Sequence, residues 1–553
     1  MNICLVHGYH LTGTGSNIYV KNLAGKLCSM GHNIFIMCQE PHAERINFVN
    51  EVYVFSKTNK NYKRKFNRKT SFPGICRVFK PDLDGKLLVY VKDSYEEFSI
   101  VETFQESSLD EVENFILKNV NALGTIIKNY NIDFIQTNHC IMQPYIAYLA
   151  AIKKNIPYIV SLHGSALNFS VKESKILFEY AKIGLNNAKK IVAVSEYNAE
   201  ELYEYFKKKK VVLKPEIKVI PAGVDLNLFL ISSNNRDGLI SSLKNIMGKK
   251  IKALNQGESV LQKQKLIEKI KYLSLDPQVR QIFYAASGKY NYLHPDSDVL
   301  DTLNSINCKK DKIILFVGKY LWTKGIQAII AAIPMILKKV PEARFIFTGF
   351  GKSKEILQAL IFSLSTGNNE LFEYMIVNHL KLDAGSEVKT PGVCSMFLES
   401  LKKNRKYDLY FKDAKKLPVE ERTHFTGIMS HEELKYLLPA ADVFTSPSIF
   451  TEAFGVVAIE ALSSGIFPVI TYNAGFRELY DSMINFFNED LFRSMPKLYI
   501  NDKLVENLAA SIITILNFKK RKSIEFKKKC RQFIEEKYSW EIVAGEYIEE
   551  FTK

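Results

Sequence analysis

Short apolar runs and longer stretches with helical spacing alternate along most of the chain. The short runs predict buried strands at 2–6, 33–38, 133–138, 157–162, 188–195, 313–317, 344–348, 423–427, 443–445 and 468–471. Between them lie longer stretches, among them 17–30, 111–130 and 326–339, whose apolar residues have the spacing of a helix. Strands that alternate with helices are typical of parallel sheets, so the pattern predicts an α/β protein.

The stretch 442–478 combines this pattern with candidate chemistry. Its first strand ends in a loop that contains Glu452, and a helix predicted at 455–462 contains Glu460. The N-terminus of a helix presents backbone N–H groups and favours anions. The stretch therefore offers two carboxylates beside an anion site. A sugar linked to a nucleotide diphosphate has the matching groups, because its hydroxyls bind carboxylates and its phosphates bind N–H groups.

Glu460 is the more telling of the two glutamates. A glutamate in a helix usually faces water, but all of its near neighbours are apolar: Val456, Val457, Ala458, Ile459, Ala461 and Leu462. Such an apolar helix is mostly buried, and a buried carboxylate without a partner is destabilising. We therefore expect Glu460 to be retained for a function rather than for stability.

The run P-S-x-x-x-E-A-F-G-V-V-A-I-E-A, from Pro447 to Ala461, resembles the E-x7-E signature of retaining glycosyltransferases of family 4, in the superfamily of glycogen synthase and phosphatidylinositol mannosyltransferase. The resemblance implies a GT-B fold, in which two Rossmann-like α/β domains face a central cleft. It also implies retaining transfer of a sugar from a nucleotide-diphosphate sugar to a glycan, a lipid or a small-molecule acceptor.

Three further motifs fit this resemblance. Gly13 and Gly15 follow the first predicted strand, where glycine permits a ligand to approach the backbone closely. His163 stands directly after the strand at 157–162, at the edge of an open sheet where ligands bind. Lys319 and Lys324 precede a predicted helix and suit a diphosphate leaving group. Lys319 replaces the arginine usual in the family, which keeps the charge but loses the bidentate fork.

The resemblance also implies roles for these residues. Glu460 would hold the ribose hydroxyls, and Glu452 would hold the sugar hydroxyls. The implied catalytic residues are His163, Glu452 and Lys324. The implied donor-binding residues are Gly13, Gly15, Lys319, Lys324, Glu452, Phe454, Gly455, Val456 and Glu460. No metal and no other cofactor is expected, because the lysines and the helix N-terminus would stabilise the departing diphosphate.

The resemblance is interrupted twice. It covers about 1–40, 130–230, 312–351 and 423–553. The expected domains are an N-terminal acceptor-side domain at 1–229, completed by a C-terminal helix at about 536–553, and a nucleotide-sugar domain at 313–535. Two insertions remain: a helical linker region at 230–312, and a segment at 352–422 that looks poorly structured. Helical patterns at 356–364 and 370–382 within the second insertion suggest a lid or decoration.

Asp82 and Asp84 have the D-x-D spacing with which another glycosyltransferase class holds a metal ion. Pro81 and Gly85 flank the pair, so we interpret it as a hairpin turn.

Composition and charge indicate the cellular location and the kinds of partner. The eight cysteines of the 553-residue chain are scattered without a C-x-x-C pair, which indicates reduced thiols and no zinc site. Neither a signal peptide nor a membrane-spanning stretch is expected, so we predict a cytoplasmic protein. The net charge is +16, with basic runs at 57–69, 207–210 and 519–529. These runs indicate solvated faces or peripheral contact with an anionic membrane. No nucleic-acid recognition motif accompanies them.

Two alternatives remain open from the sequence. One is another GT-B enzyme: a nucleotide-sugar epimerase, which needs no acceptor, or a phosphorylase, which needs a lysine for pyridoxal phosphate that no segment matches. The other is a non-catalytic carbohydrate-binding protein on a decayed GT-B fold. The presence of Lys324, Glu452 and Glu460 argues against decay, and only Lys319 argues for it.

Overall fold

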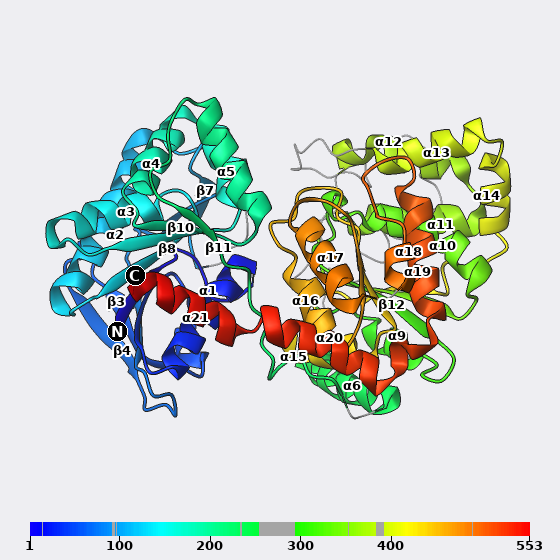
Figure 1. Cartoon of the computed structure of the whole chain (residues 1–553), viewed down its shortest axis with the longest axis horizontal. Helices are drawn as coiled ribbons and strands as arrows, with labels where there is room; N and C mark the ends of the chain where they lie inside the picture. The colour runs from blue at the N-terminus through cyan, green and yellow to red at the C-terminus, as the bar shows by residue number, and fades with distance from the viewer. Residues whose placement is uncertain are drawn as a thin grey trace. The chain divides into compact units, whose positions relative to one another are not determined.

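The structure is a computed structural model. It describes residues 1–13, 15–90, 95, 97–232, 235–253, 294–351, 353–382, 392–488 and 490–552. The chain divides into two compact units (Figure 1). The first unit is Met1–Gly223 with Tyr538–Lys553, and the second is Val224–Lys537. Each unit is built around a largely parallel sheet, as the sequence predicts.

The division after Gly223, rather than after residue 229, has a physical cause. The Arg531 guanidinium donates hydrogen bonds to the carbonyls of Leu226 (2.7 Å) and Phe229, so the segment after Gly223 is tied to the second unit. Residues 254–293 of the predicted linker region lie outside the described residues.

The sheet of the first unit has nine strands in the order β11-β10-β9-β8-β1-β2-β5-β3-β4. In that order the strands are β11 (Ile217–Val219), β10 (Lys190–Ala193), β9 (Tyr158–Leu162), β8 (Phe134–Asn138), β1 (Asn2–Val6), β2 (Asn33–Met37), β5 (Cys76–Lys80), β3 (Val49–Phe55) and β4 (Tyr62–Asn67). Only the pairing of β3 with β4 is antiparallel. The strand order reverses between β1 and β8, and ligands bind at such positions in open α/β sheets.

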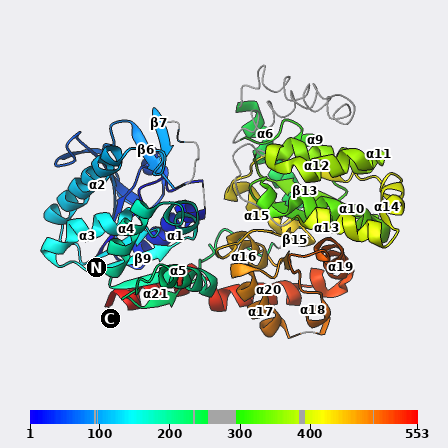
Figure 2. The same ribbon diagram turned by 90° about the horizontal axis from the view of Figure 1, so that it is seen from above.

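The α-helices in the described part of this unit are α1 (Gly15–Ser29), α2 (Leu109–Asn129), α3 (Gln143–Ala151), α4 (Lys175–Asn186), α5 (Glu196–Lys208) and α21 (Trp540–Thr552). The last of them comes from the end of the chain and lies beside α1 (Figures 1 and 2). Trp540 packs edge-on against Tyr19 at 5.2 Å between ring centroids, and Phe551 packs on Phe134 at 4.6 Å. The terminal helix is therefore part of the core of the first unit.

The predicted hairpin at Asp82–Asp84 is wrong. The chain does turn there, with positive φ at Asp84 and Gly85. However, β5 belongs to the main sheet, whereas the next strand, β6 (Lys86–Val89), pairs in parallel with β7 (Ile100–Thr103) in a separate two-stranded sheet. Lys118 forms ion pairs with both aspartates. The two carboxylates thus serve a local turn and a lysine contact.

The basic run at 57–69 forms the edge of the main sheet. Strand β4 is the last strand of the order, and its residues Lys63, Arg64 and Lys65 are exposed. Charged side chains on an edge strand oppose pairing with another chain. This part of the positive charge therefore has a structural explanation.

The second unit holds a five-stranded parallel sheet in the order β14-β13-β12-β15-β16. Its strands are β14 (Thr423–Phe425), β13 (Ala343–Thr348), β12 (Lys312–Val317), β15 (Val443–Ser446) and β16 (Pro468–Ile470). The chain runs from β12 to β13 on one side, and β15 lies on the other side of β12. The strand order therefore reverses between β12 and β15.

The helices of the second unit surround this sheet (Figures 1 and 2). They are α6 (Arg236–Ala253), α9 (Val299–Asn304), α10 (Ile326–Lys339), α11 (Lys354–Thr366), α12 (Asn369–Leu382), α13 (Val393–Lys403), α14 (Tyr407–Ala414), α15 (His431–Ala440), α16 (Val456–Ser463), α17 (Ala474–Phe487), α18 (Asp490–Ser494), α19 (Leu504–Asn517) and α20 (Ile524–Lys537). The linker helix α6 is held by an ion pair of Arg236 with the buried Asp442 at 2.6 Å.

The expectation that 352–422 is poorly structured is wrong for its described part, although the helices indicated at 356–364 and 370–382 are present as α11 and α12. Helices α11, α13 and α14 pack beside α10, and α12 packs on α11 and α13, all with buried apolar residues. The Tyr410 hydroxyl on α14 donates a hydrogen bond to the Ala331 carbonyl on α10 at 2.7 Å. The insertion is thus a packed helical layer of the second unit.

Candidate functional site

Two loops meet where the strand order of the second unit reverses. One follows β12 and carries Lys319 and Lys324, and the other follows β15 and carries Glu452. The Thr323 carbonyl joins them, because it accepts hydrogen bonds from the backbone N–H groups of Ile449 (2.9 Å) and Phe450 (3.2 Å). Motifs more than 120 residues apart in the sequence thereby form one site.

Gly325 permits this close approach. Its φ of +72° lies in the left-handed region, and a Cβ built on it would stand 1.9 Å from the Pro447 carbonyl oxygen. Any other residue would push the two loops apart. With the loops held together, the Lys324 ammonium forms an ion pair with the Glu452 carboxylate. Two residues that the sequence assigns to the donor site are thus in contact.

The start of helix α16 is fixed in a similar way. Gly455 precedes the helix with a φ of +91°, and a Cβ there would stand 1.9 Å from the ring of Phe476 on α17. The Gly475 N–H donates a 3.0 Å hydrogen bond to the Glu452 carbonyl. The loop before α16 is therefore pressed against α17, with Phe454 buried and Val456 half-buried at the first helical position.

Glu460 lies on the buried side of the same helix. Its side chain is only about 5% exposed, and the His431 ring nitrogen Nε2 stands 3.3 Å from its Oε1 atom. Its second oxygen, Oε2, has no hydrogen-bond partner among the described residues. Burial raises the pKa of this carboxyl from 4.5 to about 8. A buried carboxyl with an unused acceptor is the expected state of a binding group that awaits hydroxyl donors.

The burial of Glu460 predicts how the free energy of unfolding depends on pH. The pKa of this carboxyl is about 8 in the folded protein and near 4.5 in the unfolded chain. Its contribution to the free energy of unfolding is therefore fully present below pH 4.5 and is lost as the pH rises through about 8. Glu460→Gln cannot ionise, so it should gain roughly 2–4 kcal/mol over the wild type between pH 5 and pH 9.

Urea unfolding at pH 5, 7 and 9 measures this difference. Glu506→Gln, on the exposed side of α19, is the matched control and should follow the wild type at each pH. Equal pH dependence in all three proteins would show that Glu460 ionises freely in the folded state.

Lys319 contributes a second positive charge to the loop after β12. Its ammonium lies 5.5 Å from the centroid of the Phe350 ring. Together with Lys324 and the N-terminus of α16, it gives this edge of the sheet cationic groups beside two carboxylates. Such a set can bind a ligand that has both phosphates and hydroxyls.

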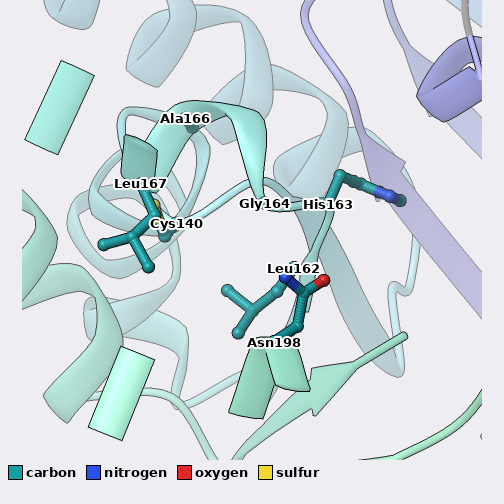
Figure 3. A pocket seen from close by; sticks show the side chains of 7 residues that line it. All are labelled: Cys140, Leu162, His163, Gly164, Ala166, Leu167 and Asn198. Atoms are coloured by element: carbon teal, nitrogen blue, oxygen red, sulfur yellow. The ribbon is translucent and has the colours of Figure 1, made fainter. Parts of the chain in front are cut away.

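The first unit has its own polar cluster at the point where its strand order reverses. His7 follows β1, His139 follows β8 and His163 follows β9. The ring of His139 lies between the other two, at 5.7 Å from His7 and 5.1 Å from His163 between centroids. His163 also lines a small pocket with Cys140, Leu162 and Asn198, and its ring points away from Leu167 and Cys140 (Figure 3).

All three imidazoles are neutral at pH 7. Burial lowers the pKa of His7 to about 4 and that of His163 to about 3, and the pKa of His139 also lies well below its ordinary value. The cluster therefore offers hydrogen-bonding nitrogens rather than positive charge.

The predicted glycines lie beside this cluster. Gly13 has a φ of +95°, and Gly15 is the first residue of α1. A Cβ built at either position meets no described atom within 4 Å beyond its chain neighbours. Asn17 ties the loop to the histidines, because its side chain contacts His7 Nε2 at 2.8 Å and donates to the Thr12 carbonyl at 2.7 Å. Gly13, Gly15 and His163 thus belong to one unit, and the other predicted site residues belong to the second.

Sequence analysis missed His431, His7 and His139. His431 begins α15 next to a capping box of Ser430 and Glu433, so its position suggests only a helix start. His7 and His139 follow predicted strands just as His163 does, and that shared position was the available signal.

Several broader features concern metals, membranes and thiols. In the described ranges, no group of three His, Cys, Asp or Glu side chains has the arrangement of a metal site. No helix of the described chain is long and apolar enough to cross a membrane. All eight cysteines are described, and each is a free thiol, as the sequence indicates.

Two sequence models of known families match the chain. Glycosyltransferase Family 4 matches residues 96–228, and Glycosyl transferases group 1 matches residues 403–540. The first match lies in the unit with the histidine cluster. The second includes Glu452, Gly455 and Glu460.

Curated relatives align over part of their length. An uncharacterized glycosyltransferase of Methanocaldococcus jannaschii is 24% identical over 289 residues, which cover 50% of this chain and 57% of that protein. Mannosylfructose-phosphate synthase of Agrobacterium fabrum is 26% identical over 204 residues, covering 36% of this chain and 35% of that protein. The chain thus spans about a third to somewhat over half of these relatives.

Solved structures share the fold over the whole chain. A glycosyltransferase from Rickettsia africae aligns with 100% of this chain and 97% of its own, at 16% identity and a TM-score of 0.53. HepE from Anabaena, solved in complex with UDP, aligns with 100% of both chains at 13% identity and a TM-score of 0.52. The two family matches and the shared fold of two α/β units support a family 4-like glycosyltransferase with the GT-B fold.

Proposed function

We propose that this protein is a retaining glycosyltransferase that moves a sugar from a nucleotide-diphosphate sugar to a hydroxyl of an acceptor. The observation that carries the proposal is Glu460, a buried carboxyl with an unused oxygen, on the helix that follows the loop where Lys324 pairs with Glu452. The structural relative HepE was solved with UDP, which supports a nucleotide in a site of this fold.

The polar and charged groups of the second unit each bind one part of the nucleotide sugar. Glu460 binds the ribose hydroxyls, and Glu452 binds the sugar hydroxyls with the N–H groups of Phe454, Gly455 and Val456. Lys319 and Lys324 neutralise the diphosphate. No metal ion is needed for this charge balance, because two ammonium groups and a helix N-terminus face the phosphates.

The reaction separates charge at the sugar. The bond between the anomeric carbon and the phosphate oxygen breaks, and its electron pair leaves with the diphosphate. The acceptor oxygen bonds to the same face of that carbon, and the acceptor proton passes to the departing diphosphate. Lys324 stabilises the developing negative charge, so its effect is largest in the transition state.

The first unit takes the acceptor side. His163, Gly13 and Gly15 are assigned to contact with the donor sugar, as the family resemblance implies. The acceptor is a glycan, a lipid or a small molecule with a free hydroxyl. The net charge of +16 favours an acceptor at an anionic membrane surface on the cytoplasmic side.

Thermal unfolding against UDP, GDP, ADP and their sugar conjugates tests the donor site. A ligand at about 100 times its dissociation constant should stabilise the folded protein by roughly 2.7 kcal/mol. We expect a shift with one base and none in Glu460→Ala, which lacks the ribose acceptor. Glu506→Ala is the control and should keep the shift. If no nucleotide shifts the wild type, the donor assignment fails and a carbohydrate-binding role without catalysis takes its place.

A further inference from the structure

One face of the first sheet carries four polar side chains in a row. Strands β8 and β9 are parallel neighbours with Asn138 opposite Ser161. Because alternate residues of a strand share a face, Gln136 and Asn138 lie on the same face of β8. Ser161 lies on β9, and His163 comes two residues later, just beyond the end of that strand. Apart from His163, these side chains are fully buried.

A continuous series of hydrogen bonds joins these side chains to the terminal helix. The Tyr19 hydroxyl on α1 donates to the Tyr547 hydroxyl on α21 at 2.9 Å, which in turn contacts the Ser161 hydroxyl at 2.6 Å. Ser161 accepts from the Gln136 amide at 2.6 Å, and the same amide donates to Asn138 at 3.2 Å. Asn138 then contacts His163 Nε2 at 3.0 Å.

The orientation of Asn138 determines which nitrogen of His163 carries the proton. A backbone carbonyl can only accept, and the Asn138 amide nitrogen donates to the Val6 carbonyl at 3.3 Å. It also donates to the Gln136 side-chain oxygen at 3.0 Å. The Asn138 oxygen must therefore face His163, so the His163 Nε2 atom carries a proton. Because the ring is neutral, its Nδ1 atom is a bare acceptor, and no described residue donates to it.

We propose that Asn138 and Tyr547 are positioning residues of His163, which hold its ring and its tautomer so that Nδ1 accepts a hydrogen bond from a hydroxyl of the sugar. The role of the sugar hydroxyl rests on the proposed function, whereas the tautomer and the part of Tyr547 rest on the geometry alone. Tyr547, on the last helix of the chain, thus helps to fix the tautomer of His163, which lies 384 residues earlier in the sequence. Its direct contact is Ser161, two residues before His163.

The histidine tautomer is tested by ¹⁵N NMR of the full-length protein with labelled histidine, with the His163 signals identified by their absence in His163→Gln. We expect the Nε2–H tautomer at pH 7. We also expect exchange of this proton with water to be about tenfold faster in Tyr547→Phe, which loses the hydrogen bonds of the Tyr547 hydroxyl with Tyr19 and Ser161. The Nδ1–H tautomer, or unchanged exchange in Tyr547→Phe, would overturn the proposal without any nucleotide in the sample.

Tyr158→Phe is the matched control. Tyr158 is a buried tyrosine on β9 whose hydroxyl donates to the Gly184 carbonyl, on the opposite face of the strand from Ser161. Its removal should lower stability by a similar amount and leave the His163 signals unchanged. Equal effects of the two substitutions on the His163 proton would mean that Tyr547 acts only through stability.

A kinetic comparison uses the nucleotide sugar that gives the largest thermal shift, with water as the acceptor. In Tyr547→Phe, kcat should fall about fivefold to tenfold with little change in KM, whereas Tyr158→Phe should change neither. A change in KM alone would overturn the positioning role. If no nucleotide sugar binds, the proposed function fails, but the NMR result still decides the tautomer and the role of Tyr547.

Discussion

Lys324→Ala should lower kcat/KM for sugar transfer by on the order of 100-fold, or about 3 kcal/mol of transition-state stabilisation. The ammonium of Lys324 is held against Glu452 by the two loops that meet at Gly325 and Pro447. Its loss removes the charge that we propose stabilises the departing diphosphate, and it leaves Glu452 without its ion pair. The measurement is steady-state transfer with the nucleotide sugar identified by thermal shift.

Two variants isolate this effect. Lys338→Ala removes another lysine of the second unit, which pairs with Asp413 on the surface, and should leave kcat/KM within about twofold of the wild type. Lys324→Arg keeps the charge and should recover part of the rate. Turnover of Lys324→Ala near that of the wild type would show that the diphosphate lies elsewhere.

Deletion of residues 538–553 should unfold the first unit while the second unit stays folded. The deleted helix α21 buries Trp540, Val543, Ala544, Tyr547 and Phe551. At roughly 1.5–3 kcal/mol for each large apolar side chain, the loss is about 8 kcal/mol. This is comparable with the whole stability of a typical domain, about 5–15 kcal/mol. Hydrogen exchange read by mass spectrometry should show lost protection in β1 and β8.

The second unit serves as the internal control of the hydrogen-exchange experiment. Peptides from β12 and β13 belong to the second unit and should keep their protection in the shortened chain. A synthetic peptide of residues 538–553, added in excess, should restore protection in β1 and β8. If β1 and β8 stay protected without the peptide, the first unit folds without its last helix.

The strands of the second sheet, and β1, β2, β8, β9 and β10 of the first, were predictable because their apolar runs are short and bounded by polar or glycine residues. Strands β3 and β4 were not predicted, and β4 was interpreted only as a basic run. The grouping of Lys324 with Glu452 was also accessible, since both motifs follow strands and a resemblance relates them. Sequence patterns could not show that Gly325 presses against Pro447, because that contact depends on which strands are neighbours. The order of the strands is a property of the folded sheet.

Other features could not be predicted from the sequence, for related reasons. His431 meets Glu460 only because α15 and α16 pack together, and nothing in its local sequence indicates a carboxylate partner. The Asp82–Asp84 turn looked like a hairpin, since turn residues predict a reversal but do not determine which sheet receives the next strand. Within 352–422 the sequence indicated helices at 356–364 and 370–382 but not a packed layer, because the buried faces of α11, α13 and α14 are completed by α10.

The late position of α21 in the chain has a consequence for biosynthesis. The first 223 residues leave the ribosome early, but the helix that completes their core is made only after residues 224–537. At about 5–20 residues per second, the incomplete unit waits for roughly 15 to 60 s. During this interval the surface that later receives Trp540 and Tyr547 is uncovered, so chaperones that bind exposed apolar surface would meet the nascent chain there. The second unit contains all of its own strands and can fold first, which reverses the usual order from the N-terminus to the C-terminus.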